Sequence, residues 1–96
     1  MRVVLDGKTI RSEQDLHDRL AGPLDFGPYY GRNLDALWDR LYRDVPRPVE
    51  LVWEDAATSA EHLGEELSGR IAALLVKVME SDAAYPPEQR FTVRFA

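Results

Sequence analysis

Two aspartates four residues apart, Asp35 and Asp39, are the side chains of this sequence best placed to act together. On a helix, residues at i and i+4 lie on the same face. Two adjacent carboxylates can serve as a general acid and base in hydrolysis, or they can bind cationic groups of a partner. Like charges at this spacing destabilise their own helix by roughly a few tenths of a kcal/mol, so the pair invites a functional explanation.

Hydrolysis by this pair has little support in the sequence. There is no cysteine, no Gly-rich loop that would bind an anion, and no pattern typical of an activated nucleophile. His17, next to Leu16, is typical of a hydrogen-bonded structural histidine rather than a base. The sequence therefore predicts a protein that is not an enzyme, with no catalytic residue and no cofactor.

A metal site is also a weak candidate. His62, Glu65 and Glu66 could offer one nitrogen and two oxygens to a metal ion, but they lie on both sides of Gly64, at an expected helix junction. Residues 48–69 hold six acidic residues and no Lys or Arg. This stretch favours solvated helix ends over an acidic surface for a basic partner. We expect no metal here.

The two aspartates also have an ordinary structural interpretation. Asp39 could pair with Arg43 at i+4, and Asp35 with Arg32 at i−3, which would make this a solvated, salt-bridged face. Trp38, on the border of the apolar stripe, could equally be a simple core residue. Spacing alone leaves both interpretations open.

A loop before this helix favours a protein interface. Residues 25–31 contain two Gly and one Pro and cannot form regular structure, so we expect a loop that displays Tyr29 and Tyr30. The loop leads directly into the helix that carries Trp38 and the two aspartates. Tyr and Trp are favoured anchors of protein interfaces.

Composition limits the remaining classes of function. The chain has 96 residues, 17 Asp and Glu against 12 Lys and Arg, a formal net charge of −5 and no cysteine, which describes one small acidic domain over residues 1–96. Its basic residues are scattered, so direct binding to nucleic acid is not expected. No apolar run approaches a signal-peptide core or a membrane span. We expect a soluble, cytoplasmic protein.

The elements that position these side chains follow from apolar periodicity and turn signals. Ser12 and Asn33 have the pattern of helix N-caps, Asp55 is expected to cap the third helix, and the second helix ends before Pro46. The expected strands are 2–5, 49–54 and 91–95, and the expected helices are 13–21, 34–45, 56–63 and 66–82. The order β-α-α-β-α-α-β contains two long crossovers, which predicts an α/β fold with a three-stranded parallel sheet packed by about four helices.

The run from Tyr29 to Asp39, Tyr-Tyr-Gly-Arg-Asn-Leu-Asp-Ala-Leu-Trp-Asp, closely resembles the barstar family of intracellular inhibitors of secreted bacterial ribonucleases. The resemblance also covers Gly7, residues 10–12, residues 15–17 and Trp53, and it thins after about residue 55. The fold that it implies is a three-stranded parallel sheet with helices packed against it, in agreement with the order above.

The resemblance implies inhibition of a small, basic, secreted microbial ribonuclease in a 1:1 complex, with carboxylates placed where RNA phosphates would bind. The protein would be monomeric when free. The residues implied at the partner-binding site are Tyr29, Gly31, Asn33, Asp35, Trp38 and Asp39. An acid near the end of the last helix is also implied, for which Glu80 and Asp82 are both available.

Two departures from the family pattern leave the target open. Arg32 is a cation where the family has an acid, and Arg43 lies on the same helix as Asp39 and could pair with it in the free protein. The alternative function is a barstar-like immunity or interaction module directed at a different toxin or protein.

Overall fold

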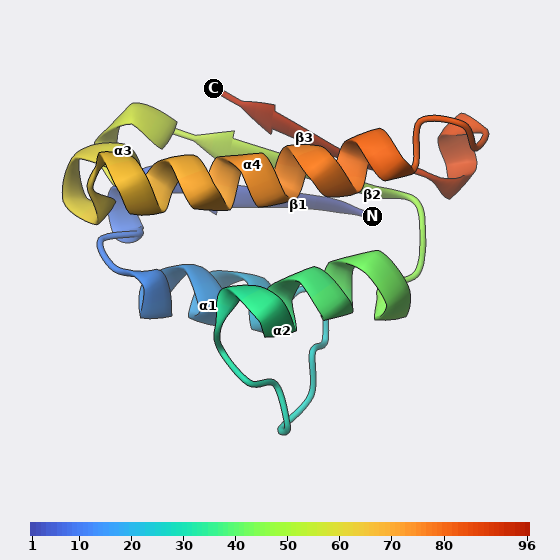
Figure 1. Ribbon diagram of the computed structural model, residues 1–96, viewed down its shortest axis with the longest axis horizontal. Helices are drawn as coiled ribbons and strands as arrows, with labels where there is room; N and C mark the ends of the chain where they lie inside the picture. The colour runs from blue at the N-terminus through green and yellow to red at the C-terminus, as the bar shows by residue number, and fades with distance from the viewer.

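The computed structural model describes all residues from 1 to 96 and has the expected element order, β-α-α-β-α-α-β (Figure 1). The elements are β1 (Arg2–Asp6), α1 (Glu13–Ala21), α2 (Leu34–Asp39), β2 (Val49–Glu54), α3 (Ala56–Leu63), α4 (Glu65–Ser81) and β3 (Phe91–Phe95). Short 3₁₀ turns lie at Gly7–Thr9 and Pro87–Gln89, and a π-helical turn, Arg40–Asp44, continues α2. No helix of the chain is both long enough and apolar enough to span a membrane.

The sheet is parallel throughout, and β2 lies between β1 and β3. Leu51 of β2 is level with Val3 of β1 and Val93 of β3. This confirms the predicted three-stranded parallel sheet. Because side chains alternate along each strand, this register puts Val3, Leu51 and Val93 on the same face of the sheet.

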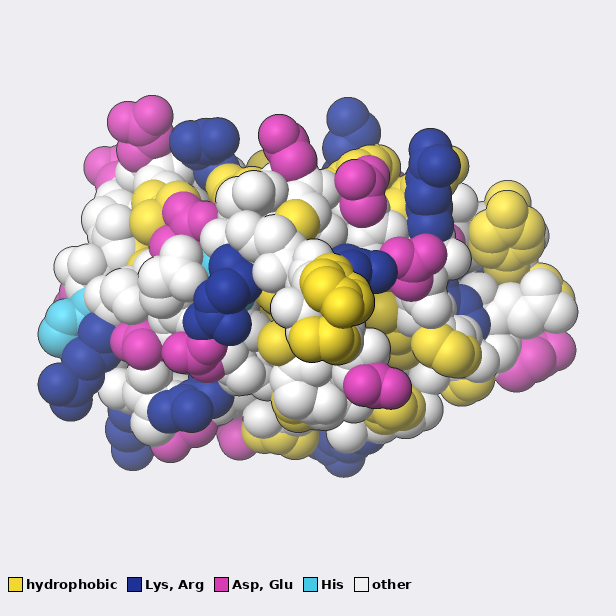
Figure 2. All heavy atoms as spheres, turned by 90° about the horizontal axis from the view of Figure 1, so that it is seen from below, with side chains coloured by type: hydrophobic (Ala, Val, Ile, Leu, Met, Phe, Trp, Pro, Cys, Tyr) yellow, Lys and Arg dark blue, Asp and Glu magenta, His cyan; other side chains and the backbone are white.

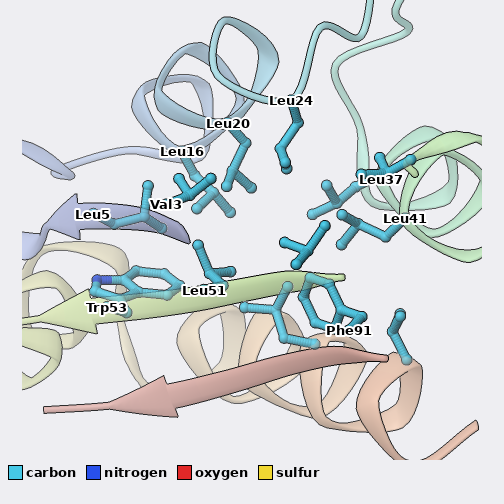
Figure 3. Close-up of a cluster of buried hydrophobic side chains, with 14 of the residues drawn as sticks. Val3, Leu5, Leu16, Leu20, Leu24, Leu37, Leu41, Leu51, Trp53 and Phe91 are labelled. Atoms are coloured by element: carbon cyan, nitrogen blue, oxygen red, sulfur yellow. The ribbon is translucent and has the colours of Figure 1, made fainter. Parts of the chain in front are cut away.

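The helices pack against that face, where one apolar core forms. Side chains of the strands point toward leucines of α1 and α2 (Figure 3), and Ile71, Leu75 and Val78 of α4 belong to the same cluster. The opposite face of the sheet stays open and is mostly charged. Its exposed residues are Arg2, Val4, Asp6, Glu50, Glu54 and Arg94.

Two of the three predicted helix caps have the expected geometry. The Ser12 hydroxyl accepts a hydrogen bond from the Asp15 amide at 3.2 Å, and the Asn33 side chain accepts one from the Ala36 amide at 2.8 Å. The prediction for Asp55 was wrong, because its side chain makes no capping hydrogen bond. Asp55 adopts a left-handed conformation with φ 51°, which turns the chain from β2 into α3.

The second helix differs from the single regular helix predicted up to Pro46. Its α-helical part ends at Asp39, and the chain continues through a wider turn in which the Val45 amide bonds to the Arg40 carbonyl at 3.1 Å. Asp35 and Asp39 therefore keep α-helical spacing. The chain beyond Asp39 follows the wider turn as far as Asp44.

Candidate partner-binding site

Asp35 and Asp39 lie one turn apart on α2, and both are exposed. Neither carboxylate takes part in an ion pair within the protein. On α1, by contrast, the carboxylate of Asp18 is paired with Arg32. The two carboxylates of α2 are thus free to meet cations supplied by another molecule.

The ion pairs that would have made this an ordinary solvated face do not form. Arg32 pairs with Asp18 of α1 instead of Asp35. Arg43 makes no ion pair with Asp39, and it lines a polar groove together with Asp82. Of the two interpretations that the spacing left open, the structure therefore does not bear out the one in which Arg43 pairs with Asp39 and Arg32 with Asp35.

The tyrosine loop, residues 25–31, displays one tyrosine rather than two. Tyr29 is 91% exposed, whereas Tyr30 is only 8% exposed and belongs to the core. The loop projects away from α1 and α2 (Figure 1). The prediction that both rings are displayed was wrong for Tyr30, because its ring packs on Phe26 and its hydroxyl contacts the buried His17.

Tyr30 fixes the loop to α1. Its hydroxyl lies 2.5 Å from His17 Nδ1, the ring packs on Phe26 with a centroid distance of 4.6 Å, and His17 Nε2 lies 3.0 Å from Glu13 Oε2. His17 is fully buried, which confirms the structural role predicted for it. Burial raises the pKa of Tyr30 well above its usual value, the Glu13 carboxylate adds to this rise, and Arg40 opposes it.

Gly31 and Asn33 shape the connection between the loop and α2. A Cβ on Gly31 would lie 3.2 Å from the Ala36 methyl, so a side chain there would make a tight contact with the first turn of α2. The Asn33 amide nitrogen donates to the Gly31 carbonyl at 3.4 Å, while its oxygen caps α2. Both residues are exposed and lie between Tyr29 and Asp35.

Trp38 borders the core and the surface, as its position on the helix predicts. It is half-buried, packs against the core cluster and stacks on Tyr42, with 5.1 Å between ring centroids. The Lys77 ammonium of α4 lies 5.8 Å from the centre of its ring. Trp38 therefore combines a packing role with an accessible edge beside the two aspartates.

Two cations beside the site were missed by the sequence reasoning. Arg70 and Lys77 of α4 line a shallow groove with Asp35 and Trp38, and neither cation has an ion-pair partner in the protein. Only the packing of α4 beside α2 brings them there, so no local pattern in the sequence could have found them. The surface around the aspartates is of mixed charge.

Only one of the two acids at the end of α4 is free. Asp82 is 6% exposed, and its carboxylate accepts hydrogen bonds from Arg47 Nε at 2.9 Å and from the Phe91 amide at 2.7 Å. Asp82 therefore holds α4 to β3 and is not available to a partner. Glu80 is exposed and lies one turn beyond Lys77.

The other candidate residues do not assemble into a site. His62, Glu65 and Glu66 are exposed, and no cluster of histidines and acids in the chain is arranged to hold a metal ion. Figure 2 shows the face that carries the loop, with apolar side chains gathered at its centre and charged groups of both signs on either side. This face, made by the loop, α2 and the adjoining part of α4, is the candidate site.

Comparison with known proteins points in the same direction. Residues 1–94 match the family described as "Barstar (barnase inhibitor)". A protein of Bacillus subtilis (strain 168) named "Putative ribonuclease inhibitor YrdF" is 44% identical over 63 residues, which are 66% of this chain and 69% of the relative. The family match includes every residue of the candidate site.

Proposed function

Because the chain belongs to the barstar family, we propose that it inhibits a small, basic, secreted microbial ribonuclease by covering its active site. The observation that carries this proposal is the pair of exposed carboxylates, Asp35 and Asp39, which have no ion-pair partner within the protein and lie on one face of a helix. The family name and the name of the relative support a ribonuclease as the target.

The chemistry of the target explains why carboxylates would inhibit it. A ribonuclease holds a phosphodiester with Arg, Lys and His side chains, and carboxylates form strong charge-assisted hydrogen bonds with the same donors. Asp35 and Asp39 would occupy the positions of RNA phosphates without offering a bond to cleave. The protein thus acts as a folded mimic of the substrate.

The rest of the site would supply contact area and rigidity. Tyr29 offers an exposed aromatic anchor, Gly31 lets the backbone approach the target, and Asn33 fixes the start of α2. Trp38 would contact the target with its accessible edge. Glu80 is the acid of α4 that remains available to extend the contact.

A specific observation supports a second candidate function. Arg70 and Lys77 lie unpaired beside Asp35 and Trp38, and cations there would repel an enzyme surface that is uniformly positive. They favour a target that carries an acidic group at the rim of its cationic site. The second candidate is therefore a barstar-like immunity or interaction module directed at a different toxin or protein.

The test is a titration of the purified chain into barnase and into a panel of other small basic secreted ribonucleases. We expect complete inhibition of at least one enzyme at a 1:1 ratio, a monomeric free chain and a 1:1 complex in size-exclusion chromatography. A mononucleotide bound in the active site should compete with the chain. Inhibition that the mononucleotide does not reduce would contradict the proposed site of action.

A further inference from the structure

The segment that carries the tyrosine loop into α2 is attached to one face of α1 at two points. Tyr30 is hydrogen-bonded to His17, and the Arg32 side chain is hydrogen-bonded to Gln14 and Asp18. The three α1 residues are spaced at i, i+3 and i+4, so they share one face of the helix. Tyr29 and Gly31, which flank Tyr30, are exposed to solvent.

Arg32 is held by several contacts at once. Its Nε donates to Gln14 Oε1 at 3.0 Å, its guanidinium pairs with Asp18, and Gln14 Nε2 donates to its carbonyl oxygen at 3.5 Å. Its backbone has φ 55°, in the left-handed region that residues other than glycine rarely adopt. Such a conformation persists where the surrounding contacts enforce it.

We propose that Arg32 and Asp18 form a clamp that fixes Tyr29 and the start of α2 in their binding geometry before the target arrives. This inference rests on the function proposed above. Arg32 is then a positioning residue and does not itself contact the ribonuclease. Pre-organisation of this kind improves affinity because less conformational freedom is lost on binding.

The clamp also explains how a cation is tolerated in this position. Arg32 lies between Gly31 and Asn33 and precedes Asp35 by three residues, so it stands within the candidate site. A free guanidinium there would repel a cationic active site. Paired with Asp18, it adds no net charge to the surface that meets the target.

The clamp can be separated from long-range charge effects, because its two partners have opposite charges. Arg32→Gln makes the protein more acidic, and Asp18→Asn makes it less acidic. Steering toward a basic enzyme would strengthen inhibition in the first variant and weaken it in the second. The clamp predicts that both variants dissociate faster, with inhibition constants roughly three- to tenfold higher.

The double variant Arg32→Gln/Asp18→Asn decides between a clamp and a direct contact. If the two residues act through each other, the double variant inhibits about as well as either single variant. Additive losses, or a loss for Arg32→Gln alone, would overturn the clamp. Glu61→Gln, an exposed acid on α3, is the charge-matched control for Asp18→Asn and should dissociate like the wild type.

The rigidity of the loop can also be measured in the free protein, without any ribonuclease. Backbone ¹⁵N order parameters of residues 29–33 should be near the rigid value of about 0.85 in the wild type and fall clearly in both single variants. An exposed ion pair contributes little to global stability, so the thermal midpoint should hardly change. Unchanged order parameters would overturn the clamp, whereas failure of the wild type to inhibit any enzyme would overturn only the proposed function.

Discussion

The hydroxyl of Tyr30 lies 2.5 Å from Nδ1 of the fully buried His17, while the ring of the preceding residue, Tyr29, is 91% exposed. Two neighbouring tyrosines therefore have opposite roles. Tyr30 anchors the loop in the core, and Tyr29 lies outside it.

Replacement of Tyr29 should separate binding from folding. We expect Tyr29→Ala to weaken inhibition by about 1–3 kcal/mol, the usual range for an aromatic anchor, and to leave the free energy of unfolding unchanged. Tyr85→Ala, which removes an exposed tyrosine outside the site, is the matched control and should inhibit like the wild type. Equal inhibition by Tyr29→Ala and the wild type would remove the loop from the interface.

Tyr30 should make stability fall at alkaline pH. Its pKa is raised by burial from the unperturbed value of 10.0, so above pH 10 the unfolded chain loses this proton while the folded protein keeps it. The stabilisation is complete below pH 10 and decreases as the pH rises further, by up to about 1.4 kcal/mol per pH unit.

The difference in unfolding free energy between the wild type and Tyr30→Phe isolates this effect from other titrating groups. We expect the difference to be constant between pH 7 and 9, a range that lies below the unperturbed Tyr pKa of about 10. Above pH 10, the wild type should lose unfolding free energy relative to Tyr30→Phe. A difference that stays constant across the alkaline range would show that Tyr30 ionises as freely in the fold as in the unfolded chain.

Trp38 should affect stability and inhibition together. Trp38→Ala removes the stacking on Tyr42 and part of the packing against the core, which we expect to cost about 1–2 kcal/mol of unfolding free energy for this half-buried ring. Inhibition should fall as well. Trp38→Phe keeps an aromatic ring in the same position, so it should recover most of the stability. If Trp38→Ala folds as stably as the wild type, the packing role is wrong.

Most of the fold could be predicted because local signals and periodicity agree along this chain. The alternation in residues 49–54 predicted the central strand. The N-cap residues Ser12 and Asn33 predicted where α1 and α2 begin. The prediction failed where a local rule competed with chain geometry. Asp55 is a good cap by residue type, but the turn out of β2 requires a left-handed residue there.

The site was less predictable because it depends on contacts between distant segments. Tyr29 and Tyr30 are identical by residue type, and the buried one is the tyrosine that contacts Phe26 and His17. The partner of Arg32 is 14 residues away on α1, and Arg70 and Lys77 reach the site from α4. The spacing of Asp35 and Asp39 within one helix depends only on local sequence, so it could be predicted correctly.

Salt should act mainly on association. Between 0.05 and 0.5 M salt the Debye length falls about threefold, which weakens attraction between the acidic chain and a basic enzyme at long range. We expect the association rate constant to fall at least about tenfold and the dissociation rate constant to change much less. Stopped-flow mixing across this range of salt concentrations measures both, and an association rate independent of salt would argue against an electrostatic approach.

In the proposed mechanism, Asp39 contributes to binding of the target and not to the stability of the fold. It has no ion-pair partner, it lies one turn from Asp35, and it is too far into the helix to gain from the N-terminal dipole. Asp39→Ala should therefore leave stability unchanged or raise it by roughly a few tenths of a kcal/mol. In the complex, its loss would leave buried cations of the enzyme without a partner, which costs about 2–5 kcal/mol of binding free energy.

The direct test is a thermal melt and an inhibition titration of Asp39→Ala beside Glu61→Ala, which removes an exposed acid outside the site. The proposed mechanism predicts that Asp39→Ala melts at or slightly above the wild-type temperature and inhibits at least about thirtyfold less, the factor that corresponds to 2 kcal/mol, while Glu61→Ala inhibits like the wild type. Destabilisation by more than about 1 kcal/mol with inhibition intact would show that Asp39 belongs to a structural face, and the proposed mechanism would be wrong.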